Sequence, residues 1–307
     1  MTSIITLNKR IDPPNRPRPT VRVVVWGGLG NQLFCASAGM ALAMRLGADL
    51  EFGTHHYARD KLRTYELGIF DLTARAVDRP RWHLSARQSA VQRWRNRLIA
   101  NGALSTTIWR QSGYHYDETF AELSGNVYLR GGFQSYRYFE EVSATIRQAF
   151  DLRPHLSEVG RSYCDSAKGD DTVALHIRRG DYVTDPANEA IFTVLAGDYY
   201  QRSLGLVCRF VARPRLFVVS DDLDAARAML TQWPNAEFIQ NTTHLDDMHL
   251  ITSCRHRIIA NSSFSWWGAW LDSRADGITI APRECFTREF MMNNFMLDLY
   301  PPGWITI

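Results

Sequence analysis

Residues 173–181 read VALHIRRGD, an apolar run that leads directly into two arginines, a glycine and a carboxylate. A buried parallel strand delivers the residues after it to the edge of the sheet where open α/β folds bind ligands. Arg178 and Arg179 would repel each other at that edge unless an anion lay between them, and a planar guanidinium matches phosphate oxygens in pairs. The stretch therefore predicts a phosphate or diphosphate site. An ion pair between an arginine and Asp181 is the competing interpretation.

Strands and helices are expected to alternate after this stretch, which favours a parallel sheet with helices on both faces. The expected helices span residues 198–211, 223–233, 246–254 and 263–271. The expected strands span residues 215–220, 237–239, 257–260 and 278–280, the last being the final strand of the chain.

A strand–helix–strand pattern also opens the chain. The elements expected in this half are a strand at 21–26, a glycine-rich turn at 27–32 (GGLGNQ), a helix at 33–46, a strand at 49–52, a strand at 127–130 and a helix at 143–150. Residues 151–154 would form a hinge. The prediction is an α/β protein with two facing Rossmann-like domains, residues 1–155 and 156–307, and a cleft between them. The C-terminal tail could pack back on the first domain.

Composition narrows the class of protein. A formal charge of +3 argues against nucleic acid as a partner, and no basic stripe with interleaved aromatic residues is present. Five scattered cysteines without a C-x-x-C pair favour reduced thiols in a cytoplasmic protein. Neither a signal peptide nor a long apolar span is apparent in the sequence. The arginine-rich segment 79–97 is expected to be a solvated helix face, with a peripheral contact to a membrane or lipid-linked acceptor as the second interpretation.

A second informative stretch, NSSFSWWGAW at residues 261–270, leaves an expected strand and enters an expected helix. Serines at a helix start cap it, and the free backbone N–H groups there attract phosphate. A phosphate contact is therefore favoured for the serines, while core packing is favoured for Trp266, Trp267 and Trp270.

The glycine-rich turn leaves a nicotinamide-dependent oxidoreductase open as an alternative. Its dinucleotide fingerprint would need a glycine at Leu33, which is absent. Glu51, however, lies near the place where a ribose-binding acid would stand.

Taken together, these motifs resemble the α-1,2-fucosyltransferase family. They are HIRRGD at 176–181, SDD at 220–222, SFSWWGA at 263–269 and GGLGNQLF at 27–34, and they occur in the family's order. The H-x-R-R-x-D run also resembles that of α-1,6- and protein O-fucosyltransferases. The glycine motif and the serine–tryptophan run are similar to the α-1,2 branch, in its soluble bacterial form.

The resemblance implies a GT-B fold and an inverting, metal-independent transfer of L-fucose from GDP-L-fucose, without a cofactor. The implied acceptor is the 2-hydroxyl of a terminal β-galactose in a glycan such as a bacterial surface polysaccharide. A fucosyltransferase of another linkage stays open. So does a sugar-binding protein on an inactive scaffold, although such a protein would be expected to have lost the arginine pair.

The resemblance also implies roles for individual residues. One arginine of the pair would bind the β-phosphate, since charge accumulates on departing GDP, and Asp247 would bind guanine. His176 would flank the nucleotide or fucose, or else hold the loop. The general base is open among Asp181, Asp185 and Glu189. The remaining donor-binding residues expected are Ser263, Phe264, Ser265, Gly28, Gly30, Asn31 and Gln32.

Overall fold

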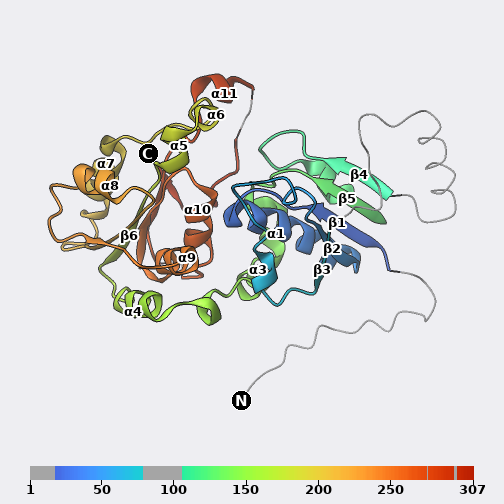
Figure 1. Cartoon of the computed structure of the whole chain (residues 1–307), viewed down its shortest axis with the longest axis horizontal. Coiled ribbons are helices and arrows are strands. Elements are labelled where there is room, and N and C mark those ends of the chain that lie inside the picture. Colours follow the sequence, from blue (N-terminus) through green and yellow to red (C-terminus); the bar gives the residue numbers. More distant parts are fainter. Residues whose placement is uncertain (1–17, 79–105, 275, 294–295) are drawn as a thin grey trace, which may run out of the picture.

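The computed structural model describes residues 18–78, 106–274, 276–293 and 296–307, which form two α/β domains (Figure 1). The first domain is built on a five-stranded sheet in the order β3-β2-β1-β5-β4, and every pairing within it is parallel. Its strands are β1 (Thr20–Val24), β2 (Asp49–Gly53), β3 (Ala74–Val77), β4 (Thr106–Arg110) and β5 (Asn126–Arg130). Its helices are α1 (Leu29–Leu46) and α3 (Ser143–Ala149), with short 3₁₀ turns at Leu67–Ile69, Glu118–Glu122, Tyr136–Tyr138, Glu140–Val142 and Arg153–His155.

The second domain has a six-stranded parallel sheet in the order β11-β10-β9-β6-β7-β8. Its strands are β6 (Thr172–Ile177), β7 (Arg215–Ser220), β8 (Glu237–Phe238), β9 (His256–Ile258), β10 (Thr279–Ala281) and β11 (Ile305–Thr306). Its helices are α4 (Glu158–Ser166), α5 (Gly180–Thr184), α6 (Pro186–Glu189), α7 (Gly197–Val207), α8 (Leu223–Met229), α9 (His244–Ser253), α10 (Ser263–Trp270) and α11 (Arg288–Asn293). The apolar run 173–177 belongs to β6, a fully buried strand in the interior of this sheet.

The expected α/β class with two Rossmann-like halves is confirmed, and this pair of parallel-sheet domains is the GT-B arrangement. Two expectations need correction. The helix after the first strand begins at Leu29 rather than residue 33, because Gly28 is already its N-cap and the glycine motif forms its first turn. The strand at β10 is not the final one, because β11 pairs beside it at the sheet edge.

Helices α1 and α10 lie between the two sheets and join the domains (Figure 1). The tryptophans of α10 are buried, as expected, but the core they enter is shared with the first domain. The ring of Trp266 lies 4.5 Å from that of Phe34 in α1, and Trp267 stacks on Phe139 at 5.5 Å. Burial of large aromatic rings on both sides fixes the relative position of the domains.

The C-terminal tail contacts both domains. The Asp298 carboxylate accepts a hydrogen bond of 2.9 Å from the backbone N–H of Tyr116 in the first domain. The indole N–H of Trp266 donates to the carbonyl of Leu299 at 2.8 Å. The chain then returns to the second sheet as β11.

Two sequence-based interpretations concern features away from the cleft. Within the described residues, all five cysteines are free thiols and four are buried, as expected. No helix in the described ranges is long and apolar enough to cross a bilayer. The arginine-rich segment 79–97 lies outside the described residues.

Candidate active site

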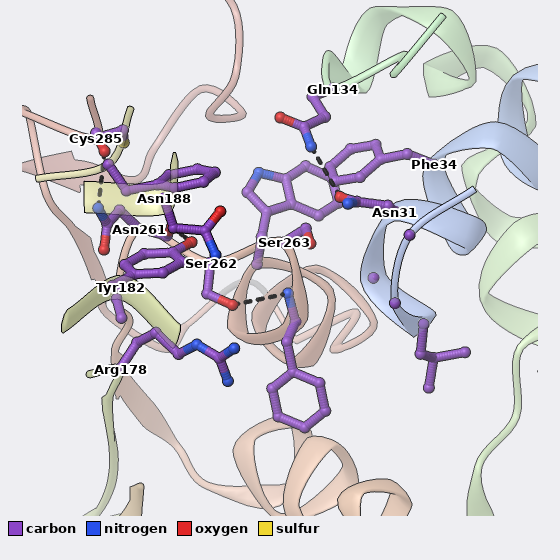
Figure 2. A pocket seen from close by; sticks show the side chains of 18 of the residues that line it. Asn31, Phe34, Gln134, Arg178, Tyr182, Asn188, Asn261, Ser262, Ser263 and Cys285 are labelled. Carbon is purple, nitrogen blue, oxygen red and sulfur yellow. Dashed lines mark hydrogen bonds between the residues drawn. The ribbon is translucent and has the colours of Figure 1, made fainter. Parts of the chain in front are cut away.

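A cavity of about 880 Å³ lies between the two domains and is lined by residues of both. It opens at the carboxyl end of β6, where the sequence placed the anion site. The structure brings nine of the expected site residues to its wall. They are His176, Arg178, Asp185, Asp247, Ser263, Phe264, Gly28, Gly30 and Asn31. Figure 2 shows Arg178 and Asn31 reaching toward this space from opposite domains.

The two arginines of the pair have different positions relative to the cavity. Arg178 lines the cavity, and its guanidinium is 2.9 Å from the Asp221 carboxylate. Arg179 does not line the cavity. Its backbone N–H donates to Asp221 at 2.9 Å, and its side chain lies 3.8 Å from Asp222. Successive side chains of an extended segment point to opposite sides, so only one of two neighbours can face the cavity.

The carboxylates that hold these arginines come from the end of β7. The parallel register pairs Ile177 with Ser220, so the residues that follow each strand are neighbours. A Cβ at Gly180 would lie 2.5 Å from the Asp221 carboxylate, which explains the glycine after the arginines. Asp221 and Asp222 are carboxylate partners of the arginines that the sequence did not indicate. The side chain of Asp181 itself lies outside the described part of the structure.

Two helix N-termini meet at the cavity. Helix α10 begins under the N-cap Ser262, whose hydroxyl accepts from the Phe264 N–H at 3.3 Å, and Ser263 lines the cavity beside it. Helix α1 begins after Gly28. A Cβ at Gly30 would lie 2.6 Å from the Ser263 carbonyl carbon, so the two termini touch. Unpaired N–H groups and helix dipoles at such ends attract anions.

Two further residues expected to touch the donor are buried away from the cavity. The Ser265 hydroxyl is fully buried and donates at 3.4 Å to the Ala260 carbonyl. Gln32 is also fully buried. Its amide donates to the carbonyls of Gly27 and Thr64, and its oxygen accepts from the Glu66 N–H at 2.8 Å. Gln32 therefore braces the loop at the cavity wall. The sequence-based expectation that Gln32 contacts the donor is therefore wrong.

His176 is an uncharged wall residue. It is only 4% exposed, and its Nδ1 has no hydrogen-bond partner among the described residues. Burial, and next the charge of Arg178, lower the pKa of His176 to about 3. The imidazole is therefore neutral at physiological pH. It can offer one donor and one acceptor to a ligand, but it is a weak base.

Two adjacent carboxylates at the start of α9 have different surroundings. Asp247 lines the cavity and accepts a hydrogen bond of 2.6 Å from the Thr242 hydroxyl, and burial raises its pKa. Asp246 is buried and accepts four hydrogen bonds, two from Ser157 and two from Thr243. Asp246 thus fixes the helix start, and Asp247 presents its carboxylate to a ligand.

Several cavity residues were not anticipated from the sequence. Glu66 and His244 bridge the domains, and the Gln134 amide donates to Asn31 at 2.9 Å (Figure 2). Aromatic residues of α5 and of the segment after β10 also face the cavity. These contacts join positions far apart in the chain, so no local sequence pattern predicts them. The glycine turn before Gln134 was the one available signal.

The nicotinamide alternative loses its main support. Glu51 does not line the cavity, but lies between Arg22 and Arg75 of the neighbouring strands and is hydrogen-bonded to both. Burial alone would raise the pKa of Glu51, but the hydrogen bonds and charges of these two arginines hold that pKa below its usual value. A carboxylate committed in this way is not available to a ribose.

Fold and site together define a two-domain α/β protein with a cavity between its domains, lined by Arg178 and by the first residues of two helices. The family model described as glycosyl transferase family 11 matches residues 20–307. The chain therefore belongs to glycosyl transferase family 11.

Named relatives agree with this assignment. The chain is 28% identical to the O-antigen biosynthesis glycosyltransferase WbnK of Escherichia coli, over 92% of this chain and 98% of the relative. It is 30% identical to an alpha-1,2-colitosyltransferase of Escherichia coli, over 92% and 96%. It is 26% identical to galactoside alpha-(1,2)-fucosyltransferase 1 of Pan troglodytes, over 68% and 61%. Among solved structures, the α-1,6-fucosyltransferase NodZ soaked with GDP-fucose matches with a TM-score of 0.48 and 14% identity, over 83% of this chain and 93% of that one.

Proposed function

We propose that this glycosyltransferase moves L-fucose from GDP-L-fucose to the 2-hydroxyl of a terminal β-galactose, with inversion at the anomeric carbon. The observation that carries the proposal is that Arg178 lines the same cavity as Ser263, the first residue of α10. Guanidinium and helix N–H groups together suit a diphosphate. The α-1,2-linked activities in the names of two relatives favour the linkage.

The proposed reaction consists of three coupled changes. The acceptor oxygen forms a bond to the anomeric carbon, the bond from that carbon to the phosphate oxygen breaks, and GDP leaves with the electron pair. Arg178 and the α10 N–H groups stabilise the charge that develops on the phosphate. We propose that they do so without a metal ion or other cofactor.

A general base must accept the proton of the acceptor hydroxyl, and we propose that Asp185 is this base. Of the two candidate carboxylates whose side chains the structure describes, Asp185 lines the cavity, whereas Glu189 is exposed and does not line it. Asp185→Asn should lower the transfer rate about 10²–10⁴-fold while leaving the affinity for GDP unchanged. An unaffected rate would remove Asp185 from the mechanism.

Colitose is the competing transferred sugar, because a colitosyltransferase is 30% identical to this chain. The deciding experiment offers GDP-fucose and GDP-colitose in competition, with lactose or N-acetyllactosamine as acceptor and EDTA present. We expect an α-1,2-fucosylated product, identified by NMR. A preference for colitose, another linkage, or a strict need for a divalent metal would each overturn the corresponding part of the proposal.

The proposed activity also suggests where the enzyme works in the cell. We propose a cytoplasmic enzyme whose acceptor is a glycan of the bacterial surface, in keeping with the O-antigen glycosyltransferase among its relatives. Such an acceptor could be lipid-linked, which would bring the enzyme to the membrane surface. Sedimentation with vesicles that carry a lipid-linked galactoside, compared with plain anionic vesicles, tests this point.

A further inference from the structure

One side of the cavity is formed by four aromatic rings, here called the aromatic wall: Tyr114, Tyr182, Phe192 and Phe286. Tyr182 and Phe192 are stacked, with centroids 4.4 Å apart and planes 7° apart. Phe286 lies 5.3 Å from Phe192, and Tyr114 of the first domain lies 5.9 Å from Phe286. None of the four belongs to the apolar cores formed by the described residues. Tyr114 and Phe192 are partly buried, whereas Tyr182 and Phe286 are only 8% exposed and Phe286 also stacks on Phe290 at 5.0 Å. The four rings therefore border the cavity with the part of their surface that stays exposed.

The wall is held rigidly by its backbone. Phe192 and Phe286 form an isolated antiparallel bridge. On either side of it, the Thr193 N–H donates to the Cys285 carbonyl at 3.2 Å and the Thr287 N–H donates to Ile191 at 2.9 Å. A wall fixed before a ligand arrives loses little conformational entropy on binding.

The order of the rings gives the wall a direction. The Arg178 guanidinium lies 5.6 Å from the centroid of Tyr182, so the wall begins beside the proposed phosphate site. Phe192 and then Phe286 lead away from it, and Tyr114 completes the wall from the other domain. A sugar joined to the phosphate would meet the inner rings first. A second sugar would lie against the outer rings.

We propose that the outer part of the wall, Phe286 and Tyr114, is the acceptor subsite and binds one face of a hexose ring. This inference rests on the proposed function and names the residues that select its acceptor. A pyranose carries C–H groups on its faces and hydroxyls at its edge, so an aromatic ring covers the face. Asn188 and Asp185 lie in the same cavity and can bind the edge, in the usual combination of an apolar wall with a few polar groups.

Tyr114 is the best position to test, because it is half-buried and comes from the first domain. Tyr114→Ala should raise the KM for lactose about tenfold, since it removes an aromatic contact of this size. The KM for GDP-fucose and the slow hydrolysis of GDP-fucose without acceptor should stay within twofold of wild type. Tyr114→Phe should keep the wild-type KM, because the ring face rather than the hydroxyl makes the contact.

Phe210→Ala is the matched control, because Phe210 is 67% exposed and does not line the cavity. Phe286→Leu provides a second test if Tyr114→Ala lowers the Tm, and it should raise the KM for lactose while the KM for GDP-fucose stays within twofold of wild type. An unchanged KM for lactose in Tyr114→Ala would overturn the acceptor subsite, as would an equal loss in donor hydrolysis. A wild-type enzyme that neither binds GDP-fucose nor transfers fucose would instead overturn the proposed function.

Discussion

Glu66 of the first domain lies 2.5 Å from His244 of the second, measured from carboxylate oxygen to imidazole Nε2. Both residues line the cavity. His244 begins α9, and the backbone of Glu66 is held by Gln32. The pair therefore bridges the domains beside the site proposed for the nucleotide.

This bridge predicts a pH-dependent contribution to stability. The hydrogen bond that His244 donates to the Glu66 carboxylate raises the pKa of His244 above its ordinary 6.5, while burial opposes the shift and the nearby Asp246 and Asp247 add to it. A raised folded-state pKa stabilises the protein fully below the unfolded pKa, and the contribution is lost as pH rises through the folded pKa. Because His244 is largely exposed, the pair should contribute no more than about 1 kcal/mol.

The measurement is a double-mutant cycle of His244→Ala and Glu66→Gln, with the free energy of unfolding followed from pH 5.5 to 9. The coupling should be largest at acid pH and should vanish toward pH 9. A coupling that stays constant across this range would show that the bridge is not ionic.

The neighbouring carboxylates Asp246 and Asp247 should respond differently to the same change. Asp247→Asn should weaken GDP binding by about 1.5–3 kcal/mol, the range for hydrogen bonds to a charged group, and should leave Tm nearly unchanged. Asp246→Asn should mainly lower Tm, because Asp246 is buried and satisfies groups of Ser157 and Thr243.

Calorimetric titration with GDP and with inosine diphosphate sharpens this test, since inosine lacks the 2-amino group. Wild type should prefer GDP, and Asp247→Asn should lose that preference. If the variant keeps it, another residue recognises guanine.

The contact between the two helix N-termini predicts a strong glycine requirement. A Cβ at Gly30 would press on backbone atoms of Ser263, which cannot move aside as a flexible side chain would. Gly30→Ala should therefore cost about 1–3 kcal/mol of stability and weaken GDP binding. Gly205→Ala in α7 is the control. It meets nothing within 4 Å and should raise stability by about 0.5–1 kcal/mol. Equal chemical denaturation curves for the two variants would contradict this contact.

The sequence was most informative where strands are buried on both faces. The strand before the arginines is apolar because all of β6 is buried, and its neighbours β7 and β9 were expected for the same reason. The edge strands β3 and β4 escaped notice because most of their residues are exposed or only partly buried and carry no apolar alternation. At one edge of the second sheet, β11 has only two residues, too few for a periodic pattern.

The site was predictable in its motifs but not in its pairings. The parallel register of β6 and β7 places Asp221 beside Arg178, and a sequence does not reveal which residues of two strands lie opposite each other. The same limit hid the bridge from Glu66 to His244, which depends on how the domains pack. Gln32 looked like a ligand contact because it stands in the glycine motif, yet its amide is used to brace a loop.

The central claim is that Arg178, and not Arg179, holds the departing diphosphate. Lysine keeps the charge but cannot reproduce the planar fork, and a phosphate contact strengthens as the leaving oxygen gains charge. Arg178→Lys should therefore lower kcat about 10²–10³-fold, comparable to the loss of one oxyanion-hole donor. Arg179→Lys should keep kcat within a few-fold and lower Tm, because it contacts Asp222 outside the cavity.

The direct measurement is the kcat of fucose transfer to lactose by Arg178→Lys and Arg179→Lys, recorded beside their melting curves. We expect a large loss of kcat in Arg178→Lys alone. Near-wild-type rates in Arg178→Lys, or a larger loss of rate in Arg179→Lys, would contradict it.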